Sequence, residues 1–194
     1  MDEALLRKIF STQVTTPREA LYLESGNVPL RFTLMARRLN FLHYILNEDE
    51  DSLIRRVLTA QLSDPVKGDW ITTVLSDLES LKINLSMEEI QMSTKDHFKA
   101  LVKENMRREA FVYLMDIKAS HSKTKNLVYD KLSVQDYLTS DSPLTLKEKK
   151  FVFSARCRMT EVRCNFKTGK TDFKCRKCNK EEESQITGAS AEVS

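Results

Sequence analysis

The sequence predicts a mainly α-helical protein: a multi-helix bundle with a small cysteine-containing, hairpin- or knuckle-like appendage at its C-terminus. Only four glycines and four prolines occur among the 194 residues, which is too few turn residues for an all-β fold. Apolar residues recur at helical spacing along most of the chain. All the cysteines lie between residues 151 and 180. A content of 41% hydrophobic and 30% charged residues is typical of a soluble globular protein.

Three helices are expected in the first 47 residues. Residues 2–14 are expected to form a short first helix. A second begins at Pro17, because Thr16 can act as its N-cap and proline is favoured at the first helical position. It should stop at Gly26, a residue suited to the left-handed conformation that ends many helices. Pro29 then opens a longer helix, LRFTLMARRLNFLHYILN.

This longer helix is expected to lie at the centre of the bundle. Its apolar residues form two adjacent stripes, with Met35, Leu39, Leu42 and Leu46 in one and Leu34, Phe41 and Ile45 in the other. So wide an apolar surface predicts burial on two sides. Arg37 and Arg38 are interpreted as a solvated or ion-paired surface rather than a phosphate contact. His43 is interpreted as a hydrogen-bonded residue at the edge of the core.

The acidic run Glu48–Asp51 could indicate a metal-binding carboxylate cluster. It also lies directly before Ser52, which is a suitable N-cap for the next helix. Negative charge at that position favours the positive end of the helix dipole. The run is therefore interpreted as a helix start.

Capping signals predict three further helices before residue 120. Asp69 precedes a helix that starts at Trp70, the only tryptophan, and Ser86 with Glu89 has the spacing of a capping box. The longest helix is expected over about residues 94–119. Its apolar face comprises Phe98, Leu101, Val102, Met106, Ala110, Tyr113, Leu114 and Ile117.

The chain after residue 120 is expected to be less regular. A polar run that includes His121 predicts a loop or turn rather than a catalytic site. Residues 130–142 hold a short amphipathic piece, LSVQDYL. Thr145 and Glu148 form another capping box, which announces a last helix that runs to about Met159. The alternating pattern that follows predicts a short hairpin leading into a C-x-x-C turn.

The distribution of charged residues differs between the two ends of the chain. Residues 147–180 contain twelve Lys or Arg against three Asp or Glu, a net charge of +9, whereas residues 1–146 carry −2. This asymmetry indicates a nearly neutral body with a basic arm for a polyanion. We therefore expect a helical domain over 1–150, a basic cysteine-containing segment over 151–181 and a disordered tail over 182–194.

The C-x-x-C pair Cys175 and Cys178 has the spacing at which two thiolates of one turn grip a zinc ion. Two more ligands are needed, and Cys164 and Cys157 are the weaker candidates for them. The spacing of the four cysteines is irregular, and Cys157 lies one turn after Phe153 on a helix face. The interpretation of Cys157 as a small buried side chain stands beside the zinc interpretation.

Basic and aromatic residues alternate in the same segment. Lys and Arg side chains release counterions from phosphates, and phenylalanine rings can stack on unpaired bases. This pattern predicts binding of RNA or single-stranded DNA. The candidate contact residues are Arg156, Arg158, Arg163, Phe166, Lys167, Lys170, Phe173, Lys174, Arg176 and Lys177.

Several short segments occur in a characteristic order: LYLESGNVPLRF, ARRLNFLHYIL, KGDW, HSK, QDYL, RCRMTEVRCNF and C-x-x-C. Together they resemble the C-terminal region of reverse transcriptases encoded by animal non-LTR (LINE-like) retrotransposons. The likeness covers about residues 5–185 and rests on the ordered series rather than on one motif. It implies a mostly helical region that ends in a zinc-knuckle-like element for template RNA or target DNA.

When the family's pattern is matched to this sequence position by position, it implies a role for only a few residues. Cys175 and Cys178 match the first two ligands of the family's knuckle. Glu183–Gln185 matches the run that precedes the last two ligands in relatives, yet no His or Cys follows Cys178 here. The knuckle is therefore expected to be truncated. His121–Lys123 matches a recurring HSK whose physical role is unassigned.

Catalysis is not expected. Polymerase chemistry needs a carboxylate cluster that holds two metal ions, usually marked by a Tyr-x-Asp-Asp turn, and no such sequence occurs. An endonuclease would need converging carboxylates with a Lys or His, whereas Glu48–Asp51 is a contiguous run at a helix start.

Three interpretations follow. The first is a non-catalytic C-terminal fragment of a retrotransposon-derived, reverse-transcriptase-like protein that binds RNA or single-stranded DNA through its basic arm. The alternative is a helical interaction module that docks on a polymerase half through Trp70 and the helix after Pro29. The third is a degenerate open reading frame without selected function. Lack of a signal-peptide core and of a long apolar run predicts a cytoplasmic or nuclear location and no membrane association.

Overall fold

The computed structural model describes residues 3–10, 12, 16–121 and 123–157. Within these residues the regular structure is helical, with one isolated β-bridge between Ser25 and Val134. The prediction of a mainly α fold is confirmed. The predicted hairpin, the C-x-x-C turn and the predicted disordered tail lie outside the described residues.

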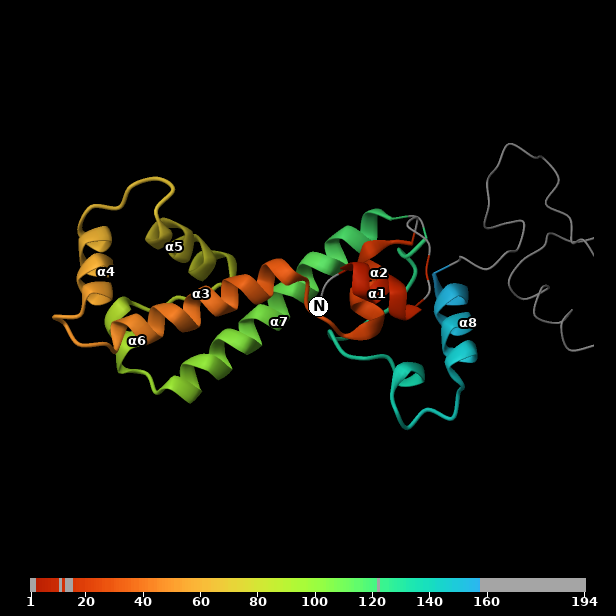
Figure 1. Cartoon of the computed structure of the whole chain (residues 1–194). Helices are drawn as coiled ribbons and strands as arrows, with labels where there is room; N and C mark the ends of the chain where they lie inside the picture. Colours follow the sequence, from red (N-terminus) through yellow and green to blue (C-terminus); the bar gives the residue numbers. More distant parts are fainter. Residues whose placement is uncertain (1–2, 11, 13–15, 122, 158–194) are drawn as a thin grey trace, which may run out of the picture. The chain divides into compact units, whose positions relative to one another are not determined.

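Figure 1 shows the helices in chain order, and their bounds agree closely with the capping signals in the sequence. They are α1 (Glu3–Phe10), α2 (Arg18–Ser25), α3 (Leu30–Leu46), α4 (Leu53–Ser63), α5 (Trp70–Ser80), α6 (Met87–Met92), α7 (Lys95–Ser120), the 3₁₀ helix η1 (Asp136–Leu138) and α8 (Leu146–Arg156).

The two predicted capping boxes form. Ser86 accepts a hydrogen bond from the Glu89 backbone N–H, and the Glu89 carboxylate accepts one from the Ser86 N–H. Thr145 and Glu148 exchange the same pair of bonds at the start of α8. Each box satisfies two backbone donors that the first helical turn leaves unpaired.

Four boundaries differ from the sequence prediction. α2 begins at Arg18 with Pro17 as its N-cap and no side-chain capping bond, and the Thr16 hydroxyl is buried without a hydrogen-bond partner among the described residues, so the predicted N-cap at Thr16 is wrong. α1 ends at Phe10 and Thr12 is not helical, so the predicted extension of this helix towards residue 14 is wrong at Thr12. The LSVQDYL piece holds only the single turn η1. α8 ends at Arg156 with Cys157 as its C-cap, earlier than the predicted end at Met159. Helix ends are the part of a helix that local sequence determines least.

The chain divides into two compact units. Among the described residues, unit 1 comprises residues 28–113, and unit 2 combines those up to residue 27 with those from 114 to 157. α7 contributes residues 95–113 to unit 1 and its last turns to unit 2. The predicted border between a helical domain and a basic segment, at residue 151, falls inside α8.

Unit 1 is built around α3, which packs against α4, α5 and α6. α7 runs antiparallel to α3, because Phe32 contacts Tyr113 near one end of the pair and His43 stacks on Phe98 near the other. The expectation that α3 is a central helix agrees with these contacts. Its buried side chains are Phe32, Ala36, Leu39, Leu42, His43, Ile45 and Leu46.

The predicted second apolar stripe of α3 is only partly buried. Ile45 is in the core, whereas Leu34 and Phe41 remain 42% and 45% exposed. The two stripes together are wider than the surface that the neighbouring helices of unit 1 cover. An apolar residue at helical spacing is therefore not always a core residue.

Polar residues of α3 lie as the sequence suggests. Arg38 makes two hydrogen bonds to the buried carboxylate of Asp77, with Nε–Oδ2 at 2.5 Å and Nη2–Oδ1 at 2.9 Å. His43 is buried and its Nε2 lies 2.9 Å from the Ser93 carbonyl oxygen. The interpretations of Arg38 as an ion-paired residue and of His43 as a hydrogen-bonded core-edge residue are both confirmed.

Unit 2 surrounds the short helix α2. α1 packs on α2, and the ring of Phe10 stacks on Phe153 of α8 at a centroid distance of 4.5 Å. η1 packs on α8. In the part of the chain that the structure describes, no helix is long and apolar enough to cross a membrane.

Candidate functional site

Helix α2 places two carboxylates in the interior of unit 2. Glu19 is 3% exposed and Glu24 is fully buried, among apolar neighbours from the same helix. A buried carboxylate is costly unless donors surround it. The contacts of these two residues therefore define the polar centre of the unit.

Glu24 is held by three side chains from three separate segments. The hydroxyl of Tyr129 donates to Oε1 at 2.5 Å, and the hydroxyl of Tyr137 donates to Oε2 at 2.8 Å. Arg156 donates from Nε to Oε1 at 2.8 Å, which forms an ion pair. We call these four residues the Glu24 cluster. It joins α2 to the chain before η1, to η1 itself and to the end of α8.

Burial and the neighbouring Glu24 carboxylate raise the pKa of both tyrosines well above the ordinary range. Each hydroxyl therefore keeps its proton and acts as a donor to the carboxylate. The Arg156 guanidinium carbon lies 5.9 Å from the centre of the Tyr129 ring and 6.0 Å from that of Tyr137. These distances are at the outer limit of cation–π attraction, so the ion pair with Glu24 is the stronger contact of Arg156.

At Gly26 the backbone of α2 lies close to the backbone of residues 133–135. Gly26 ends α2 with a φ of +64°, and a Cβ there would lie 2.3 Å from the Val134 nitrogen. The Gln135 N–H donates to the Glu24 carbonyl oxygen at 3.0 Å. The predicted helix stop at Gly26 is confirmed, and the contact with residues 133–135 adds a second reason for glycine at this position.

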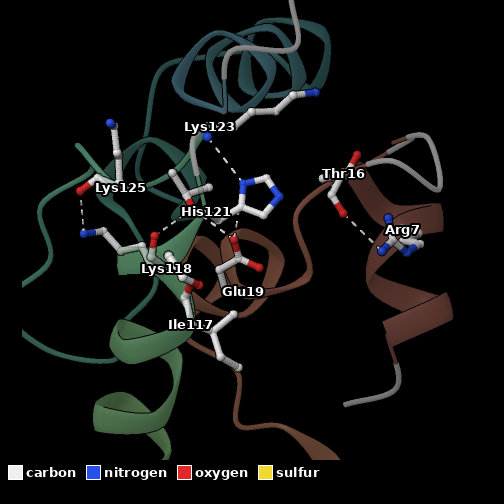
Figure 2. Close-up of polar contacts among 10 residues, drawn as sticks. Arg7, Thr16, Glu19, Ile117, Lys118, His121, Lys123 and Lys125 are labelled. Carbon is white, nitrogen blue, oxygen red and sulfur yellow. Dashed lines mark hydrogen bonds and ion pairs between the residues drawn. The ribbon is translucent and has the colours of Figure 1, made fainter.

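The second carboxylate, Glu19, faces the turn that contains His121. The buried hydroxyl of Thr124 donates to Glu19 Oε1 at 2.9 Å, and His121 Nδ1 lies 4.0 Å from the same oxygen. The Lys123 N–H donates to His121 Nδ1 at 3.3 Å. Figure 2 shows this group, with Lys118 reaching the Lys125 carbonyl at 3.1 Å.

These contacts give a physical role to His121 and to the backbone N–H of Lys123, two of the three residues in the His121–Lys123 run. The imidazole of His121 accepts a bond that shapes its own turn, and Thr124 closes the turn onto Glu19. The prediction of a turn at His121 is confirmed. The hydrogen bond from Thr124 to Glu19 links the turn after α7 to α2.

Of the predicted nucleic-acid contacts, the structure describes only Arg156, whose guanidinium binds Glu24. The others lie outside the described residues: Arg158, Arg163, Phe166, Lys167, Lys170, Phe173, Lys174, Arg176 and Lys177. Arg156 thus fixes the end of α8 at the point where the basic segment continues.

Cys157 is fully buried at the C-cap of α8. Burial, followed by the nearby Glu24 carboxylate, raises the pKa of its thiol to about 12. Zinc binds the thiolate form, so this environment favours packing over ligation. The interpretation of Cys157 as a small buried side chain agrees with this placement, whereas Cys164, Cys175 and Cys178 lie outside the described residues.

No group of three or more His, Cys, Asp or Glu side chains that could hold a metal ion occurs among residues 3–10, 12, 16–121 and 123–157. The acidic run Glu48–Asp51 lies in the turn before α4, where Ser52 accepts a hydrogen bond from the Arg55 N–H. Its interpretation as a helix start is confirmed.

Sequence reasoning missed the Glu24 cluster. Glu24 is more than one hundred residues away from each of its three partners, so no local spacing connects it to them. One signal was available: Glu24 directly follows the apolar run Leu21–Leu23 near the end of a short helix. A charged residue at such a position predicts a buried partner of opposite charge.

Comparisons with protein-family models, with curated proteins and with solved structures find no match for this chain.

Proposed function

We propose that this chain is a non-catalytic nucleic-acid-binding protein related to the C-terminal region of LINE-like reverse transcriptases. Its ligand is RNA or single-stranded DNA, and its main contact is the basic segment 151–181. The resemblance described above motivates the family assignment. The observation that carries the binding function is the charge of +9 over residues 147–180, beside a body of −2.

The structure of unit 2 supports this proposal through α8. Phe153 stacks on Phe10, and Arg156 is paired with the buried Glu24. These contacts fix the helix immediately before the remaining basic residues. A basic segment whose first residues are held in place loses less conformational freedom on binding than a free tail does. α8 is thus suited to present the arm.

Charge reversal tests the proposal. The triple variant Arg163→Glu, Lys167→Glu, Lys170→Glu should weaken binding of a labelled oligo(U) or oligo(dT) at least about tenfold, because phosphate contacts and their counterion release are lost. A matched control reverses three exposed charges elsewhere: Arg56→Glu, Lys67→Glu and Lys131→Glu. Equal loss of affinity in both variants would show that binding depends on the net charge of the protein rather than on the basic segment, and would overturn the proposal.

Zinc binding forms a separate part of the proposal, with Cys175 and Cys178 as ligands and Cys164 as the next candidate. Metal content of the purified protein should fall in Cys175→Ser and stay unchanged in Cys157→Ala, because the Cys157 thiol is buried against Glu24. Equal zinc in the parent and in Cys175→Ser would remove the knuckle from the account.

A further inference from the structure

Three aromatic side chains form a row on the surface of unit 1. Phe41 and Tyr44 of α3 lie with ring centroids 5.9 Å apart and nearly parallel, and Trp70 of α5 meets Phe41 edge-on at 5.7 Å. Phe41 is 45% exposed and Tyr44 is 52% exposed. Single exposed apolar residues are common on protein surfaces, but a contiguous aromatic group is typical of a binding surface.

The row leads into a pocket of about 610 Å³ at the C-terminal end of α3. Tyr44 belongs to both the row and the pocket wall. The volume falls in the range of ligand-binding pockets in proteins, roughly 300–1,000 Å³. The other residues that line it are Asn40, His43, Asn47, Glu48, Ser93, Thr94, Lys95 and Lys99.

Much of the pocket wall is held in place by hydrogen bonds. His43 is fixed between the Ser93 carbonyl oxygen and the ring of Phe98. Asn40 and Asn47 donate their amide N–H groups to α3 carbonyl oxygens one turn earlier, at 2.8 and 2.9 Å. A wall formed in advance lowers the entropy lost when a ligand binds.

The charges at the pocket favour an anionic ligand. Lys95 and Lys99 line it from α7, and both are exposed, whereas Glu48 is the only acidic residue among its lining residues. The Tyr44 hydroxyl is hydrogen-bonded to Glu48, which raises the pKa of Tyr44. This bond occupies part of the acidic side chain and orients the aromatic ring.

We infer that the aromatic row and the adjoining pocket bind single-stranded nucleic acid, with one unpaired nucleotide in the pocket. Its base lies against Tyr44 and its phosphate lies near Lys95 and Lys99, while the next base contacts Phe41 and Trp70. Aromatic stacking combined with a basic flank is the usual arrangement for single strands, because every base offers a flat face and every nucleotide a phosphate. An apolar peptide would leave the two lysines without a role.

This inference shares with the proposed function only the class of ligand. The row and pocket belong to unit 1, whereas α8, where the basic segment begins, belongs to unit 2. Either contact can therefore fail in an experiment while the other stands.

The single tryptophan makes the two contacts separable. Trp70 belongs to the aromatic row, so a base that reaches the row quenches its fluorescence, and the basic segment contains no tryptophan. The experiment titrates the full chain with oligo(U) and oligo(dT) of about ten nucleotides. Anisotropy of an end label on the oligonucleotide reports total binding in the same samples.

We expect saturable quenching in the parent chain. Tyr44→Ala and the double variant Lys95→Glu, Lys99→Glu should each weaken the quenching titration about tenfold, since one removes the stacking ring and the other the phosphate contacts. Tyr44→Phe keeps the ring and should stay close to the parent. The control Arg56→Glu, Lys131→Glu makes the same charge change at exposed positions outside the pocket and should also stay close to the parent.

Two results would overturn the inference. One is a rise in anisotropy, which shows that the oligonucleotide binds, without any change in Trp70 fluorescence. The aromatic row would then be a candidate surface for a protein partner instead. The other is an equal loss of quenching in the pocket variants and in the control. Circular dichroism of each variant confirms that it is folded. Quenching that persists in the Arg163→Glu, Lys167→Glu, Lys170→Glu variant supports the pocket whether or not the basic segment also binds.

Discussion

At Glu24, one buried carboxylate accepts hydrogen bonds from two tyrosines and an arginine that are each more than one hundred residues away from it in sequence. Each donor is oriented towards a charged oxygen. A glutamine amide at position 24 would place an NH₂ group opposite one of these donors, where an acceptor is needed. It would also remove the negative charge that pairs with Arg156.

We therefore predict that Glu24→Gln lowers the free energy of unfolding by about 1–3 kcal/mol. Breaking a buried ion pair costs more than this, but Arg156 keeps one third of its side chain in solvent, which reduces the effect. Urea unfolding followed by circular dichroism measures the change. Glu104→Gln, at an exposed position of α7, is the control and should change stability little. Equal stability of the two variants would show that the cluster is not structural.

Burial of the Cys157 thiol makes the free energy of unfolding depend on pH in the alkaline range. Its thiol has a pKa of about 12 in the folded protein, raised by burial from an ordinary value near 9. The unfolded state therefore releases this proton first as the pH rises. The contribution is fully present below about pH 9 and is lost above it, by up to about 1.4 kcal/mol per pH unit, until the pH passes the folded value.

In the range from about pH 9 to about pH 10, the free energy of unfolding should thus fall more steeply in the parent than in Cys157→Ala. Both tyrosines of the Glu24 cluster also have raised pKa values, so a further decline shared by the two proteins is expected above about pH 10. Urea unfolding at several pH values measures both slopes. Parallel curves below pH 10 would contradict the assignment to Cys157.

At the scale of single helices, the starts could be predicted from sequence because their determinants are local. Ser52 and the two capping boxes start their helices, and Gly26 ends α2, where the spacing indicates. The N-cap predicted at Thr16 is the exception, because α2 starts at Arg18 without a side-chain capping bond. Which side of α3 is buried could not be predicted as well. Leu34 and Phe41 fit an apolar stripe, but their exposure depends on how far α4 and α5 extend over the helix.

The capping box of α8 provides a test at this scale. Thr145→Ala removes the side-chain oxygen that accepts from the Glu148 N–H, so the first turn should open more often. Amide hydrogen exchange in that turn should quicken about fivefold. Ser86→Ala makes the matched change in α6 and should leave α8 unchanged. Faster exchange in α8 in both variants would point to a global loss of stability instead.

For the whole molecule, a mainly helical fold and an uneven distribution of charge could be predicted from the sequence, but the division into two units could not. Unit 2 brings α1 and α2 together with the described residues from 114 to 157, a separation that no local pattern encodes. The candidate site divides in the same way. The basic segment could be recognised from composition, whereas the Glu24 cluster and the aromatic row require the fold.

Salt dependence of binding tests the central claim most directly. If the basic segment contacts about six phosphates of a single strand, affinity for labelled oligo(U) should fall roughly 10²- to 10³-fold between about 50 and 200 mM salt. The triple variant Arg163→Glu, Lys167→Glu, Lys170→Glu should show a visibly shallower slope. Affinity that is insensitive to salt in the parent chain, or a slope unchanged in the variant, would contradict binding through the arm.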